Sequence, residues 1–171
     1  SATVLIGGRP AARMGDLARQ IAAAAYRAGS PLVETIYSDE RQLSMRFKYA
    51  PRGSFDHFSG WLSNVLRDHV EAGHAVLLIS AGDPELLAGE PPDLVSAVLQ
   101  AARREMRPFS EQLYRADTNY ALVAAPSVAW AKKIFPGVPA ANAVLQLWRA
   151  IARSCRLDTV DPLAAWESHL G

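Results

Sequence analysis

Four histidines are the side chains of this chain best suited to bind a transition metal, because imidazole is the commonest metal ligand in proteins. They are His57, His69, His74 and His169. Two ligands on one face of a helix need a spacing of four residues, but His69 and His74 are five apart and the helix-ending Gly73 lies between them. We therefore expect no metal site in this chain and interpret His69 as part of a polar helix end.

A glycine-rich turn, Gly7-Gly8-Arg9-Pro10, follows the first predicted strand, where a doubly wound sheet would bind a phosphate. The pattern Gly-x-Gly-x-x-Gly is absent, no Gly-Lys-Ser/Thr follows, and Pro10 removes a backbone N–H that a phosphate cradle would use. The turn therefore favours a connecting loop over a nucleotide site.

Two side chains are candidate nucleophiles. Ser80 follows a predicted strand, but no glycine stands two residues before it, as a nucleophile elbow requires. Cys155, the only cysteine, lies in an apolar helical stripe, which predicts a small buried side chain. A single cysteine also excludes an intrachain disulfide, so we expect a cytoplasmic protein.

Short apolar runs predict the strands that would position these residues. They are residues 3–7, 31–37, 75–80 and 120–124. Apolar residues at helical spacing lie between them, at 14–28, in a short helix through 45, at 58–72 and at 92–106, where Pro108 interrupts or ends the helix. Three more helices follow after residue 126. Alternating helices and continuously apolar strands predict an α/β fold, with a mostly parallel sheet of about four or more strands and helices on both faces.

The carboxyl ends of parallel strands line the ligand cleft of such a sheet. They predict six cleft-lining residues, although plain turn chemistry remains an alternative at each position. The six are Gly8, Arg9, Asp39, Gly82, Asp83 and Ser127.

Four tryptophans stand at helical positions, where the large indole usually belongs to the core. We expect Trp61 and Trp148 to be core residues. Trp130 and Trp166 lie near turns and toward the end of the chain, so we expect them at an interface with a second domain or subunit.

The composition is that of a globular protein and predicts one α/β domain over residues 1–171. With 18 basic and 17 acidic residues the net charge is +1, which gives no field to attract nucleic acid. The sequence contains no apolar run of the length of a membrane-spanning helix, and the apolar run at residues 1–6 is too short and too uncharged to predict a signal peptide. We expect neither nucleic acid nor a membrane as partner.

Several segments, in their order and spacing, resemble the amino-terminal half of the thermophilic-type metalloaminopeptidases, the group of aminopeptidase T, aminopeptidase S and similar leucyl aminopeptidases. The matching segments are residues 25–29, 33–39, the run Gly82-Asp83-Pro84-Glu85-Leu86-Leu87-Ala88-Gly89, the pattern Ala-Pro-x-x-x-Trp-Ala at 125–131, Leu147-Trp148 and Asp-Pro-x-x-x-Trp at 161–166.

This resemblance implies a cytoplasmic, homodimeric exopeptidase that removes amino-terminal residues from peptides with two divalent metals, commonly zinc, cobalt or magnesium. The family's metal ligands lie in its carboxy-terminal half, and no position of this chain matches them. The resemblance therefore implies an amino-terminal scaffold domain that walls the catalytic cavity and supports dimerisation, is inactive alone and has the carboxy-terminal catalytic domain as its partner. The chain begins at the family's first strand and stops before the catalytic half, as a domain of a longer enzyme or a truncated relative would.

A second hypothesis is a free-standing or degenerate α/β module that binds a small ligand at the same strand ends and has no peptidase activity. An open reading frame that continues past Gly171 would favour the peptidase, and a stop codon there would favour the module.

Overall fold

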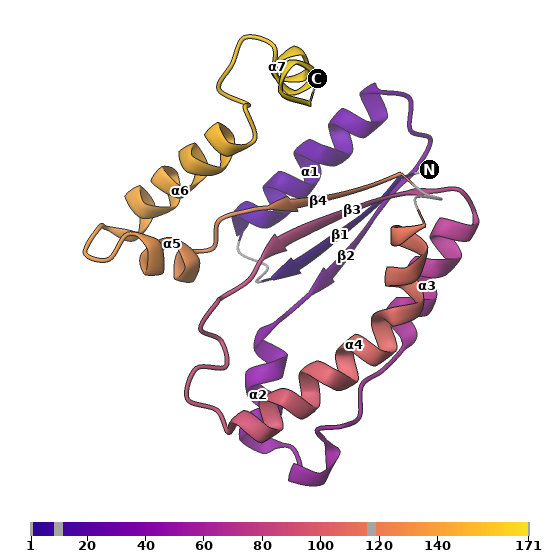
Figure 1. Ribbon diagram of the computed structural model, residues 1–171, viewed down its shortest axis with the longest axis vertical. Helices are drawn as coiled ribbons and strands as arrows, with labels where there is room; N and C mark the ends of the chain where they lie inside the picture. The colour runs from indigo at the N-terminus through magenta and orange to yellow at the C-terminus, as the bar shows by residue number, and fades with distance from the viewer. Residues whose placement is uncertain (1, 9–11, 116–118, 171) are drawn as a thin grey trace. The chain divides into compact units, whose positions relative to one another are not determined.

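The computed structural model describes residues 2–8, 12–115 and 119–170 and shows an α/β protein (Figure 1). The predicted α/β class is confirmed. The described elements are, in chain order, β1 (Ala2–Gly8), α1 (Ala12–Arg27), β2 (Val33–Ser38), α2 (Arg41–Tyr49), the 3-10 turn η1 (Arg52–Ser54), α3 (Trp61–Glu71), β3 (Ala75–Ala81), α4 (Pro92–Tyr114), β4 (Tyr120–Ala124), α5 (Val128–Ile134), α6 (Ala140–Ser154) and α7 (Pro162–Leu170).

Strands β1 and β3 are the two inner strands of the sheet. β1 pairs in parallel with β2 on one side and with β3 on the other, and β4 follows β3 in the strand order β2-β1-β3-β4. The register opposes Gly7 to Ser38 of β2, and Gly8 to Ala81 of β3. The carboxyl ends of these three strands therefore meet at one edge of the sheet.

The strand order explains where the helices lie. Parallel strands are joined by right-handed crossovers, so the path from β1 to β2 and the opposite path from β2 to β3 place their helices on opposite faces. Figure 1 shows α1 on one side of the sheet and α3 and α4 on the other. From β1 the chain adds β2 on one side of the sheet and then returns to add β3 on the other side. In such sheets the ligand crevice lies where the strand order reverses, which here is at the carboxyl ends of β1 and β3.

A buried cluster joins α3, β3 and α4. Leu66 and Val70 of α3, Val76 of β3 and Phe109 of α4 are its buried members. Leu62, Leu66 and Val70 recur every four residues, so they share the face of α3 that packs against this cluster. Burial of each such side chain contributes about 1.5–3 kcal/mol.

Helix α4 corrects one prediction. We expected Pro108 to interrupt or end a helix, but α4 continues through it to Tyr114. Proline removes one backbone hydrogen bond from a helix interior and crowds the preceding turn. The adjacent Phe109 is only 3% exposed within the α3–β3–α4 cluster, and its packing offsets this cost.

The chain forms two compact units, Ser1–Val123 and Ala124–Gly171. The second unit has its own small core, made of Ala131 of α5 with Ala143, Val144 and Leu147 of α6. The expectation of a single domain over residues 1–171 stays a prediction.

Candidate functional site

Four of the six predicted cleft residues lie at the carboxyl edge of the sheet. Gly8 ends β1, Asp39 follows β2, and Gly82 and Asp83 follow β3. The other two have separate outcomes. Arg9 lies outside the described residues, and Ser127 belongs to the unit Ala124–Gly171.

Glu40 is a residue of this edge that sequence reasoning missed. Its carboxylate accepts the backbone N–H of Asp83, at 3.0 Å from one oxygen and 3.2 Å from the other. A Cβ at Gly82 would lie 3.1 Å from the same carboxylate, which is why glycine suits this position. Glu40 thus links the end of β2 to the end of β3. No sequence signal identifies the contact, because its partners are 43 residues apart.

The two aspartates of this edge organise local turns. Asp39 accepts the N–H of Arg41 at 3.0 Å, and Asp83 accepts the N–H of Glu85 at 2.9 Å. Each is a side-chain turn of the kind that aspartate favours. The N–H of Asp83 is already bound to the carboxylate of Glu40, so it is not free to bind a phosphate. The negative charge of Glu40 would also repel a phosphate at this loop.

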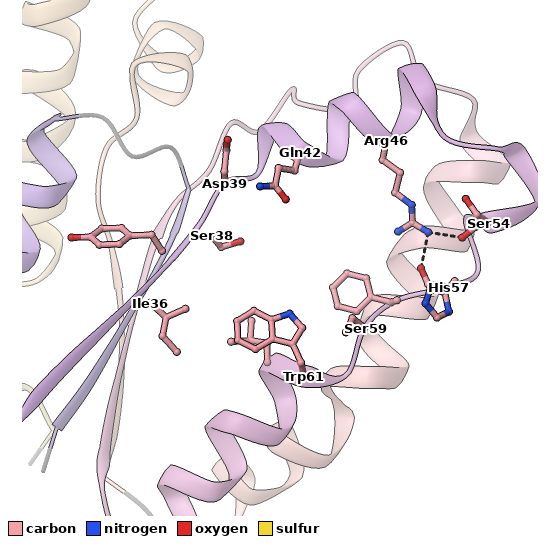
Figure 2. Close-up of a pocket in the computed structure, with 12 residues that line it drawn as sticks. Ile36, Ser38, Asp39, Gln42, Arg46, Ser54, His57, Ser59 and Trp61 are labelled. Atoms are coloured by element: carbon pink, nitrogen blue, oxygen red, sulfur yellow. Dashed lines mark hydrogen bonds between the residues drawn. The ribbon is translucent and has the colours of Figure 1, made fainter.

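A pocket with a volume of about 600 Å³ lies beside this edge, next to the carboxyl end of β2. Its walls come from the end of β2, from one face of α2, from residues 54–59 and from the start of α3 (Figure 2). Asp39 is the predicted cleft residue that lines it. The volume is within the range of small-molecule sites.

Arg46 of α2 fixes the far wall of the pocket. Its Nη2 donates to the carbonyl oxygens of Ser54, at 2.5 Å, and of His57, at 2.6 Å. Its guanidinium carbon lies 5.3 Å from the ring centroid of the buried Phe55, which packs edge-to-face against Phe47. These contacts hold the loop after α2 in one conformation.

Trp61 corrects a prediction. We expected a core residue, but its side chain is 56% exposed and lines the pocket. Leu62, Leu66 and Val70 occupy the buried face of α3, and Trp61, one residue before Leu62, lies about 100° away around the helix. Figure 2 shows its indole projecting into the space that Gln42 and Arg46 face.

The histidines do not converge on one point. His69 and His74 lie side by side at the amino end of the sheet, with their Nδ1 atoms 3.0 Å apart, and Glu34 is 3.6 Å from His69 Nε2. His57 lines the pocket, and His169 packs edge-to-face against Trp166. Among the described residues, no group of three or more His, Cys, Asp or Glu side chains is placed to hold a metal ion.

The remaining predictions concern the unit Ala124–Gly171. Trp148 is 38% exposed instead of a core residue, and Cys155 is exposed at the carboxyl end of α6 instead of buried. Trp130 packs against the core of this unit. Trp166 is 38% exposed and its indole N–H donates to the carbonyl oxygen of Cys155 at 3.0 Å. The interface roles of Trp130 and Trp166 stay predictions.

Ser127 has a structural role in the same unit. Its hydroxyl oxygen accepts the N–H of Trp130 at 3.0 Å, so Ser127 is the N-cap of α5.

No helix in the described part of the chain is long and apolar enough to span a bilayer.

Comparison with known proteins places nearly the whole chain in one family. The model of the thermophilic metalloproteases, family M29, matches residues 3–171. Aminopeptidase T of Thermus thermophilus is 36% identical over 154 residues, which are 90% of this chain and 38% of that protein. Aminopeptidase 2 of Geobacillus stearothermophilus is 30% identical over 153 residues, 90% of this chain and 37% of that protein.

A solved structure agrees with these relatives. The structure of wild-type AmpT from Thermus thermophilus superposes with a TM-score of 0.86 at 32% sequence identity, covering 99% of this chain and 40% of that chain. This chain therefore spans about two fifths of the length of the relatives that it matches, and corresponds to their amino-terminal part. It belongs to the M29 family of thermophilic metalloproteases.

Proposed function

We propose that this chain acts as the amino-terminal scaffold of a metal-dependent aminopeptidase, which removes amino-terminal residues from peptides. The observation that carries the proposal is the family match over residues 3–171, combined with coverage of only 38% of aminopeptidase T. In the whole protein the scaffold walls the catalytic cavity and supports a homodimer.

The chemistry then belongs to a carboxy-terminal catalytic domain, which holds two divalent metals (zinc, cobalt or magnesium) and is the partner of this chain. Two bridged metals polarise a peptide carbonyl and activate a water. In the part of the chain that the structure describes, no group of three or more His, Cys, Asp or Glu side chains is placed to hold such ions. With Cys155 as the only cysteine, the protein suits a reducing cytoplasm.

A free-standing or degenerate α/β module without peptidase activity is the second candidate. The pocket of about 600 Å³ beside β2 favours it, because a pocket with an exposed tryptophan is typical of a ligand site. The two candidates differ in whether this chain can support catalysis by a second domain.

A domain exchange tests the scaffold proposal. In aminopeptidase T of Thermus thermophilus, the segment that aligns with this chain is replaced by residues 1–171, and hydrolysis of leucine p-nitroanilide is measured with cobalt, zinc or magnesium. We expect metal-dependent hydrolysis by the chimera and none by the 171-residue chain alone, with full-length aminopeptidase T as positive control.

The opposite results are equally clear. A chimera that folds and binds metal but is inactive would contradict the scaffold role and favour the binding module. Hydrolysis by the isolated chain with stoichiometric metal would show that this part carries the catalytic residues itself. The folded state of each protein is checked by its thermal unfolding transition.

A further inference from the structure

We propose that the pocket between β2, α2 and α3 binds the carboxylate of an apolar amino acid, either free or at the carboxyl terminus of a peptide. Arg46 binds the carboxylate, and Trp61 covers the apolar side chain. This inference goes beyond the scaffold role and does not depend on it, because it concerns ligand binding by residues 36–62 alone.

Arg46 is prepared for an anion. Its Nη2 is held by two backbone carbonyls, Ser54 at 2.5 Å and His57 at 2.6 Å, which carry no net charge. Among the described residues, no carboxylate pairs with Arg46 and no acceptor meets its Nε and Nη1 groups, so these donors are available in the pocket wall. Because Nη2 already donates to both carbonyls, Nη1 or Nε would give the carboxylate a single charge-assisted hydrogen bond. Because the carbonyls already fix its side chain, binding costs little further conformational entropy.

The opposite wall is apolar. Trp61 is 56% exposed there, and Ile36, Phe58 and Leu62 line the same pocket. An exposed indole beside apolar side chains gains free energy when a ligand covers it, in proportion to the area removed from water. The ligand therefore combines a carboxylate with an apolar group, as leucine or phenylalanine does.

The other polar groups limit the charge of the ligand. Gln42 lies one helical turn before Arg46 on the same face of α2 and offers a neutral amide. Asp39 lines the end of the pocket nearest β2, and in Figure 2 its carboxylate is turned away from Trp61. Arg46 and Asp39 give the lining one positive and one negative group, which favours a ligand with a single carboxylate over a doubly charged phosphate.

Calorimetric titration of the 171-residue chain tests the proposal with four probes: L-leucine, acetyl-glycyl-L-leucine, and the carboxamides of both. We expect at least one carboxylate to bind about 10–100-fold more tightly than its amide, the size of a charge-assisted hydrogen-bonded pair. Binding of acetyl-glycyl-leucine alone identifies a peptide terminus as the ligand, and binding of leucine identifies the free amino acid. Either result supports the pocket.

Variants locate the site. Trp61→Ala and Arg46→Gln should each weaken binding at least tenfold, whereas Arg103→Gln, an exposed arginine of α4, should bind as the wild type does. Arg46 also holds a loop, so its variant is interpreted only if its unfolding transition is cooperative; Trp61→Ala and the amide probes test the site without that variant. Equal binding of acids and amides, no binding of either acid up to about 10 mM, or unchanged binding by Trp61→Ala would overturn the proposal.

Discussion

Glu40 links the carboxyl ends of β2 and β3, two strands that are not neighbours in the sheet. Glu40→Ala leaves the partly buried N–H of Asp83 without this acceptor, and an unpaired buried donor costs about 1–3 kcal/mol. We expect the free energy of unfolding in urea to fall by that amount, and by less in Glu40→Gln, which keeps one acceptor oxygen. Glu167→Ala, at an exposed position of α7, is the control; equal stability of the two alanine variants would contradict a stabilising role for the contact.

Gly82 should be energetically coupled to Glu40. An added Cβ would lie 3.1 Å from Glu40 Oε2, closer than ordinary van der Waals contact, while that carboxylate is held in place by Asp83. Gly82→Ala should therefore destabilise the wild type more than it destabilises the Glu40→Ala background. A double-mutant cycle measured by urea unfolding should give a coupling energy of about 0.5–3 kcal/mol, as for residues in contact. Additive effects would show that the alanine methyl group fits beside Glu40 without strain.

Ser127 is predicted to act through helix α5 and not through a cleft. Its hydroxyl oxygen caps the first turn by accepting the N–H of Trp130. Loss of such a cap costs about 0.5–2 kcal/mol, so Ser127→Ala should lower the free energy of unfolding by that amount. Ser127→Asp keeps an acceptor at the same place and should restore most of the loss. If alanine and aspartate variants were equally stable, the cap would not be the role of this residue.

Pro108 gives a prediction of opposite sign. It lies inside α4, where it leaves the carbonyl oxygen of Arg104 without an N–H partner four residues later. Pro108→Ala supplies that N–H and removes the steric clash, so the free energy of unfolding should rise by about 1–3 kcal/mol. A smaller opposing effect is the greater conformational entropy that alanine allows in the unfolded chain. Thermal unfolding monitored by circular dichroism measures this change. A lower melting temperature would show that α4 needs a bend at Pro108 to pack Phe109.

The local elements were predictable because their signals are local. Four apolar runs predicted the strands, and the structure has β1 to β4 at these places. The predicted end of α4 near Pro108 is wrong, because the helix continues to Tyr114. The buried Phe109 beside Pro108 stabilises this continuation by its packing. Helix and strand patterns depend on neighbouring residues, whereas helix ends also depend on packing.

The candidate site was only partly predictable. The strand pattern predicts a parallel sheet, and the carboxyl ends of parallel strands lie at one edge, so it also predicts that Asp39, Gly82 and Asp83 lie there. The contact of Glu40 with Asp83 and the exposure of Trp61 depend on segments that are distant in sequence, so no local pattern contains them. One wall of the pocket is a loop that Arg46 holds by hydrogen bonds to two backbone carbonyls. Every residue has a backbone carbonyl, so the sequence does not indicate which ones accept these bonds.

The two compact units of the chain differ in their ability to sustain a fold. The unit Ser1–Val123 includes the sheet and the cluster around Leu66 and Phe109. Among its described residues, the unit Ala124–Gly171 has five buried ones, three of which are alanines that bury little apolar area. Many of its larger apolar side chains, including Leu163 and Leu170, are exposed. A segment well below about 70 residues rarely gains enough from one core to fold alone.

This difference predicts how the two segments behave when they are produced separately. Residues 1–123 should keep a cooperative thermal transition, because their sheet and the α3–α4 core remain intact. Residues 124–171 should show partial helicity that declines gradually with temperature, because isolated short helices are marginal in water. Circular dichroism and the dispersion of amide proton signals distinguish the two states. A sharp unfolding transition of residues 124–171 alone would contradict the argument and indicate an independent second domain, whereas gradual melting would mean that their fold depends on the rest of the chain or on a partner.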